Sequence, residues 1–428
     1  MFSQNGLSLD QAPPLSVVFR FFFTGSIFGM LAGVLILFYQ ADIFDAHSVA
    51  AVTLTHTLTL GVMLSFMFAA LFQMLPVIAG VTLKNPIKKA NALQYPFILG
   101  VLALLFAFNL SAPWLFGIAS FLLGGSVLFI SFTMLKNILT LTHHSASSKG
   151  MLTALISLVL VVILALYLTA SLASFTEATY YTAIKEAHYS FGLFGWVALL
   201  IISISFQVIE MFYVTPPYPT LVTKYLPNTL LGLLLLSTVV SFFTPLIWVV
   251  TDVLLILLLC GYALVTLKRL TQKKRPLTDA TVLFWRMGLG SLLLSMLFMG
   301  LTLSYDIESI KSLSYLFFTS FSLSIVFAMF YKIVPFLTWF HLNSQGYFTA
   351  PMMHEVIHPK TAKKHLYIHI ATVAIFAVSI FISELTLLAG LLTMLSFGWM
   401  SYQIIHAYLL YIKTQKTGEK FDMNMGNG

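Results

Sequence analysis

The sequence predicts an all-α membrane protein, and three observations lead to that prediction. Hydrophobic residues make up 59% of the chain and charged residues only 8%, whereas a soluble domain carries about 25% charged residues. The mean hydropathy is +0.95. The apolar residues lie in stretches of the length, about 20 residues, that a helix needs to cross a bilayer. We therefore expect a single transmembrane domain over residues 1–428, surrounded by lipid.

Twelve apolar stretches follow one another, separated by short polar or proline-containing turns. We predict twelve transmembrane helices, at about 16–38, 49–80, 92–109, 113–136, 151–173, 182–214, 226–243, 245–267, 280–304, 312–340, 366–383 and 386–412. Asp10 rather than a basic segment precedes the first stretch, and no small-residue cleavage site follows it, so we interpret it as a retained span. The single cysteine, Cys260, excludes an intrachain disulfide.

Charge predicts the orientation of these helices. The formal net charge of +8 is spread over short loops, which is the distribution of orientation signals rather than of a nucleic-acid-binding surface. Most basic residues follow the even-numbered spans, whereas the other loops carry acidic residues such as Asp42, Asp45, Asp306 and Glu308. An excess of Lys and Arg marks the cytoplasmic side. We expect both termini in the cytoplasm and the protein in the inner membrane of a bacterium.

The chain also contains an internal repeat with a period of four spans. The second, sixth and tenth spans are unusually long and end alike, at Phe72-Gln73, Phe206-Gln207 and Phe330-Tyr331. Three four-helix units, at about 16–136, 151–267 and 280–412, predict a pseudo-threefold architecture rather than the twofold inverted repeat of many transporters. The alternative is that long apolar helices simply look alike.

Two histidines are the main candidates for a cofactor site. His56 and His188 lie in the second and sixth spans, each about 10 Å below the outer boundary by helix rise. Neutral imidazole is a favoured ligand of haem iron and of copper. Gly192 and Gly195 follow His188 and leave a side-chain-free groove where a flat macrocycle could lie. The alternative for each histidine is a hydrogen bond to a neighbouring helix.

Spacing shows that the two histidines are not equivalent in the repeat. His56 precedes Gln73 by 17 residues, whereas His188 precedes Gln207 by 19. Two residues rotate a helix by about 200°. On this ground the rings need not bind one metal from opposite sides.

Other ionisable residues offer a second kind of site. Glu210 and Lys332 occupy nearly the same repeat position and could form an intramembrane charge pair, and Asp252 lies about two turns into the eighth span. Ionisable groups within a membrane are costly and commonly functional. Together they favour the alternative of a transporter for ions or protons.

Four histidines in the predicted cytoplasmic loop form two pairs at helical spacing, His354 with His358 and His365 with His369. Such pairs lie on one helix face and can chelate a metal ion. No Cys or Asp accompanies them, and Pro351 and Pro359 interrupt a helix around the first pair. We expect solvated loop histidines, with metal binding as the alternative.

Twelve spans, both termini inside, a threefold repeat and histidines in spans two and six together resemble catalytic subunit I of the haem-copper oxidases. The resemblance implies that His56 stands where that family has an axial ligand of its low-spin haem, and that His188 stands in the helix that contributes to its copper centre. The family's histidines of span seven have no match in 226–243, and those of span ten have none in 312–340, where Ser320, Ser322 and Met329 stand instead.

The sequence therefore predicts a membrane protein of this type that binds haem, with copper as a second cofactor, through His56, His188 or both. We expect a role in respiratory electron transfer, with an electron-donor partner, or in the handling of a small gas or metal. Because the other ligands are missing, we do not expect oxygen reduction. The alternatives are the transporter and a cofactor-free accessory protein of a respiratory complex.

Overall fold

The computed structural model describes residues 12–81, 83–242, 247–274 and 279–420. Within them the chain is helical, and its one β-bridge joins Tyr347 to Lys420. The first third of the chain forms α1 (Leu15–Tyr39), η2 (Gln40–Phe44), α2 (Val49–His56), η3 (Thr57–Leu64), α3 (Ser65–Ala79), α4 (Pro86–Leu110), α5 (Pro113–Ala119), η4 (Ser120–Gly124) and α6 (Gly125–Leu139).

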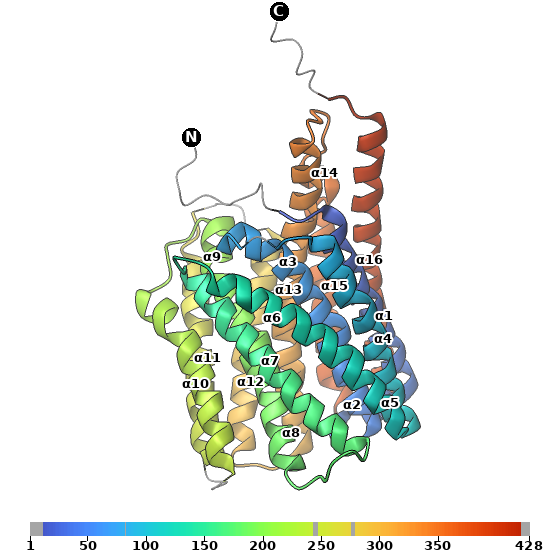
Figure 1. Ribbon diagram of the computed structural model, residues 1–428, viewed down its shortest axis with the longest axis vertical. Helices are drawn as coiled ribbons and strands as arrows, with labels where there is room; N and C mark the ends of the chain where they lie inside the picture. Colours follow the sequence, from blue (N-terminus) through green and yellow to red (C-terminus); the bar gives the residue numbers. More distant parts are fainter. Residues whose placement is uncertain (1–11, 82, 243–246, 275–278, 421–428) are drawn as a thin grey trace, which may run out of the picture.

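The second third forms α7 (Ala146–Leu172), α8 (Tyr181–Ser190), η5 (Phe191–Ala198), α9 (Leu199–Tyr213), α10 (Thr220–Ser241) and α11 (Ile247–Thr271). The last third forms α12 (Ala280–Thr302), α13 (Glu308–Ser344), α14 (Met353–Val356), α15 (Pro359–Ser379), η6 (Ser383–Leu385) and α16 (Thr386–Thr417). The long helices run side by side, and α1 begins at the same end of the bundle at which α16 ends (Figure 1).

Local sequence signals explain where many helices begin. The side chains of Ser48, Ser145 and Asp279 accept hydrogen bonds from the backbone N–H groups of the first turns of α2, α7 and α12, which is the usual role of Ser and Asp at an N-cap. A proline opens α4, α5 and α15, where its missing N–H is not needed. The helix α3 ends at Gly80, whose φ of 67° is readily adopted by glycine.

Ten helical segments in the described part of the chain are long and apolar enough to cross a membrane. The predicted count of twelve is therefore wrong by this measure. The missing two, predicted at 226–243 and 366–383, correspond to α10 and α15. Both helices carry polar residues in their first half: Lys224 and Asn228 in α10, Lys363 and Lys364 in α15. Residue 243 and the start of the predicted eighth span, at 245–246, lie outside the described residues.

The surface of the bundle supports a lipid environment. Large apolar side chains such as Phe38, Phe121 and Leu409 are exposed along the helices. Exposed apolar area on this scale marks contact with a membrane or with another protein. Together with the ten apolar helices, it makes this an integral membrane protein of the all-α class.

Helix contacts recur along the chain. The helix α1 packs on η3 and α3, α7 packs on η5 and α9, and α12 packs on α13. After each of these three contacts, the next helices along the chain also pack on each other: α4 on α5 and α6, α10 on α11, and α15 on α16. Contacts of α6 with α7, α11 with α12 and α16 with α1 close this series into a ring.

Three of the long helices contain a π-helical segment: η3, η4 and η5. Such segments are rare and frequently mark functional sites. Two of them come directly after the candidate histidines: η3 begins one residue after His56, and η5 begins three residues after His188. The site is therefore built at the point where both helices change from α to π geometry.

Candidate functional site

The structure places the rings of His56 and His188 opposite each other. Their ring centres are 6.5 Å apart and their planes are within 14° of parallel. Both side chains are half-buried. Two parallel helices that lie beside each other in a bundle contact each other through different sides of their surfaces. Histidines that are displaced by about 200° around their helices can therefore meet. Whether the two rings bind one metal from opposite sides is still a prediction.

Hydrogen bonds fix which nitrogen of each ring is available. The Nδ1 atom of His56 lies 2.8 Å from the carbonyl oxygen of Val52, one turn earlier. The Nδ1 atom of His188 lies 3.1 Å from the carbonyl oxygen of Val161 in α7. Because a carbonyl oxygen only accepts, Nδ1 carries the proton in both rings. Each Nε2 then presents a lone pair, and neither has a hydrogen-bond partner among the described residues.

This geometry fits a metal held between the two rings. Metal–imidazole bonds are about 2.0–2.1 Å long, so a metal bound to one nitrogen of each ring would separate the ring centres by about 6 Å. The observed separation is 6.5 Å. A backbone carbonyl on the far nitrogen is also the usual way in which a ligating imidazole is oriented.

The groove predicted beside His188 is only partly present. A Cβ added at Gly192 would meet no atom within 4 Å, so space is open there. At Gly195, by contrast, a Cβ would lie 2.9 Å from the hydroxyl of Ser157. In η3, which follows His56, the space beside Gly61 is likewise occupied, here by the side chain of Phe28. Space for a neighbouring group is therefore open at Gly192 but not at Gly195, which serves helix packing against α7.

Apolar and amide groups surround the His56 ring. The ring of Phe108 lies 5.2 Å from it at 44°. One turn of α2 earlier, Thr53 accepts a hydrogen bond of 3.1 Å from the Asn109 side chain, which also contacts the hydroxyl of Tyr39. These contacts tie the outer parts of α1, α2 and α4 together and hold His56 in place.

The candidate metal site consists of two histidine rings. Among the described residues, no group of three or more His, Cys, Asp and Glu side chains is arranged to hold a metal ion. A metal between His56 and His188 would therefore need ligands besides these two side chains. This requirement distinguishes the site from a closed structural zinc site, which has four protein ligands.

The predicted charge pair between Glu210 and Lys332 does not form. Lys332 Nζ lies 2.6 Å from Asp279 Oδ2, and Glu210 accepts a hydrogen bond of 3.0 Å from the backbone N–H of Tyr218. Asp279 also caps α12 by accepting from the N–H of Val282 at 3.1 Å, so its carboxylate is held within reach of α13. An aspartate directly before an apolar helix is a sequence signal for such a cap, and that signal was available before the structure.

The two loop histidine pairs have different surroundings. His354 and His358 are exposed, as expected. His365 and His369 lie inside α15 and are buried, so the expectation of solvated histidines is wrong for them. His365 Nδ1 lies 3.0 Å from the Tyr331 hydroxyl. Its Nε2 is 2.8 Å from a hydroxyl of α16, and His369 Nε2 is 2.9 Å from one of α13. These bonds occupy nitrogens that a metal would need.

No protein-family model matches this chain, and no curated protein is significantly similar to it in sequence.

Proposed function

We propose that this protein is a membrane redox protein that binds a haem iron between His56 and His188. The observation that carries the proposal is the pair of nearly parallel rings with centres 6.5 Å apart, each with Nδ1 bonded to a backbone carbonyl. The alternative is that each histidine only forms a hydrogen bond to a backbone carbonyl. This explains the hydrogen bonds of the two Nδ1 atoms, but it gives neither Nε2 atom a partner among the described residues.

The chain's own residues would do three things at such a site. The Nε2 atoms of His56 and His188 would hold the iron, and the carbonyls of Val52 and Val161 would orient the rings and increase their basicity. Phe108 covers one side of the His56 ring and limits the access of water. When bound, a haem with two imidazole ligands supplies one-electron transfer. With both rings engaged in holding the iron, the protein would favour electron transfer over the binding of a gas.

The helix arrangement supports a haem-copper-oxidase-like organisation. Contacts within the bundle recur three times with a period of four helices and close into a ring. The chain enters α1 and leaves α16 at one end of the bundle (Figure 1). With Lys and Arg concentrated in the loops at one side, we place that end in the cytoplasm of a bacterial cell. Since α10 contains no histidine and α13 contains only His341, near its C-terminal end, this protein would not reduce oxygen.

A copper ion is the second candidate, and the packing around two glycines favours it. Ser157 fills the space at Gly195, and Phe28 fills the space at Gly61, so a macrocycle would have room mainly at Gly192. A copper ion needs no such room, and copper is bound by imidazole ligands in many proteins. Haem and copper would share the ligands His56 and His188, and they differ in that only haem brings a macrocycle into the site.

The experiment is a visible absorption spectrum together with metal analysis of the purified protein. We expect a haem Soret band in wild type that is strongly reduced in His56→Ala and in His188→Ala. The matched control is His354→Ala, because that ring is exposed and belongs to the cytoplasmic pair; it should leave the spectrum unchanged. Copper without a Soret band, lost in the same two variants, would support the second candidate.

Wild-type protein with neither haem nor copper would refute the proposal and favour a transporter or an accessory protein. A wild-type spectrum in both alanine variants would refute the ligand assignment.

A further inference from the structure

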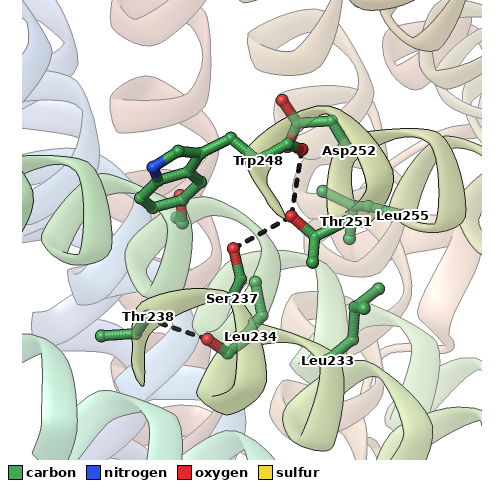
Figure 2. A pocket seen from close by; sticks show the side chains of 9 residues that line it. Leu233, Leu234, Ser237, Thr238, Trp248, Thr251, Asp252 and Leu255 are labelled. Atoms are coloured by element: carbon green, nitrogen blue, oxygen red, sulfur yellow. Dashed lines mark hydrogen bonds between the residues drawn. The ribbon is translucent and has the colours of Figure 1, made fainter. Parts of the chain in front are cut away.

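A small pocket lies between α8, α10 and α11 (Figure 2), and it is lined by none of the residues assigned to the histidine site. Its volume is about 10 Å³, which is about the space that one water molecule occupies. Apart from leucines, its walls are polar: Ser190 from α8, Ser237 and Thr238 from α10, and Trp248, Thr251 and Asp252 from α11. A pocket of this size holds one water molecule or one ion of similar size.

Oxygen atoms from two helices converge on this pocket. The Ser237 hydroxyl lies 3.0 Å from the Thr251 hydroxyl, across the α10–α11 interface. The Thr251 hydroxyl in turn donates to the carbonyl oxygen of Trp248 at 3.0 Å. Figure 2 shows this chain of contacts beside Asp252, the next residue of α11. Because the Thr251 proton is directed at this carbonyl oxygen, Ser237 is the donor between the two hydroxyls, and the lone pairs of the Ser237 oxygen remain for a cation.

The charge in this region is negative. Asp252 belongs to the candidate membrane span Trp248–Thr271. The ion pairs found among the described residues join Lys311 to Asp306 and Glu308, and Lys332 to Asp279, and Asp252 belongs to none of them. The carboxylate of Glu186 is close enough to repel it. A carboxylate in a membrane normally pairs with a cation or faces a functional cavity.

We propose that this pocket binds one monovalent inorganic cation of the size of Na⁺. Asp252 would supply the charge, and the hydroxyl of Ser237, which is oriented by its hydrogen bond to Thr251, would supply a neutral oxygen ligand. Oxygen atoms are the ligands that hard cations prefer. A single carboxylate in the walls balances one positive charge, whereas sites for divalent cations commonly use several carboxylates. The site is independent of the histidine pair, and neither proposal depends on the other.

The test is the thermal stability of the purified protein in NaCl, compared with choline chloride at the same concentration. A ligand that binds only the folded state raises the melting temperature as its concentration increases, and choline is too large for the pocket. We expect a melting temperature several degrees higher in NaCl for wild type. This sodium-specific increment should vanish in Asp252→Asn, which keeps the shape of the side chain. In Ser237→Ala it should require more sodium.

The matched control is Glu177→Gln, a carboxylate exposed in the loop before α8, which should keep the full increment. Equal melting temperatures of wild type in the two salts would overturn the proposal and assign the pocket to a water molecule beside a protonated Asp252. An undiminished increment in both Asp252→Asn and Ser237→Ala would overturn it as well. Neither outcome affects the spectrum that tests the haem proposal.

Discussion

Asp279 shows how one carboxylate can serve two helices. It caps α12 through the N–H of Val282 and pairs with Lys332 of α13. Burial alone would raise the pKa of Asp279, but the charge of Lys332 and hydrogen bonds from Lys332, Thr281 and Val282 outweigh this effect and hold the pKa below its usual value. The carboxylate is therefore ionised throughout the neutral range, and it stabilises the contact between α12 and α13.

A carboxyl group whose pKa is lower in the folded state adds stability above its unfolded pKa, about 3.9, and loses that contribution as the pH falls through the folded value. We predict that Asp279→Asn, which preserves the cap, lowers the free energy of unfolding at neutral pH. The loss should be about 1 kcal/mol, because the side chain is 39% exposed and water screens the pair.

Thermal unfolding in detergent over the acidic range would measure this effect. The difference between wild type and Asp279→Asn should shrink as the pH falls below about 4. Asp306→Asn is the control: its exposed carboxylate also pairs with a lysine, and its loss should change stability little. A difference that grows in acid would contradict the assignment.

The contact between α1 and α16 depends on glycines that let two helices approach closely. A Cβ at Gly29 would lie 2.1 Å from the ring of Phe397. At Gly33 it would lie 2.8 Å from the backbone nitrogen of Met394 and 2.9 Å from the carbonyl oxygen of Gly390. Small residues four positions apart are a common means of close helix packing in membranes. Here the contact also joins the first and last helices, which closes the ring.

We predict that Gly33→Ala destabilises the protein by about 1–3 kcal/mol, the usual cost of overpacking, because the new methyl group meets backbone atoms that cannot rotate away. Gly125→Ala is the matched control, since its helical Cβ would meet nothing within 4 Å and alanine favours a helix. The stability of both variants can be measured as the fraction of protein that remains monodisperse after heating. Equal behaviour of the two would show that α1 and α16 do not depend on this contact.

Over the whole molecule, charge and helix arrangement lead to one orientation. Lys and Arg gather in the loops that follow the even-numbered predicted spans, whereas Asp45 and Glu308 lie in loops of the other set. With the start of α1 and the end of α16 at one end of the bundle, we predict from this bias that both ends of the chain lie on the cytoplasmic side.

Single cysteines in a Cys260→Ser background would test this orientation. We predict that cysteines at positions 45 and 308 react with an impermeant thiol reagent in intact cells, whereas cysteines at positions 143 and 273 react only after lysis. All four positions lie in loops or at helix ends, so the substitutions should not disturb packing. Reaction at position 273 in intact cells, with none at position 45, would reverse the orientation.

The sequence by itself determined the fold class and part of the site. The all-α membrane class follows from runs of apolar residues, because a span of backbone in lipid must satisfy its own hydrogen bonds and a helix does so locally. His56 and His188 could be selected because an ionisable ring within an apolar span is conspicuous at any position. Whether they bind a cofactor is still a prediction.

Only the tertiary structure decided which side chains meet. His56 and His188 come close because each helix is rotated about its own axis so that its histidine points toward the other helix. The spacing of residues along one helix cannot show this rotation. The partner of Lys332 in α13 is Asp279 rather than Glu210, because Asp279, which caps the start of α12, lies beside α13. His365 became buried through hydroxyls of α13 and α16. Each of these contacts joins residues at least 30 positions apart, and local sequence patterns carry no information about such pairs.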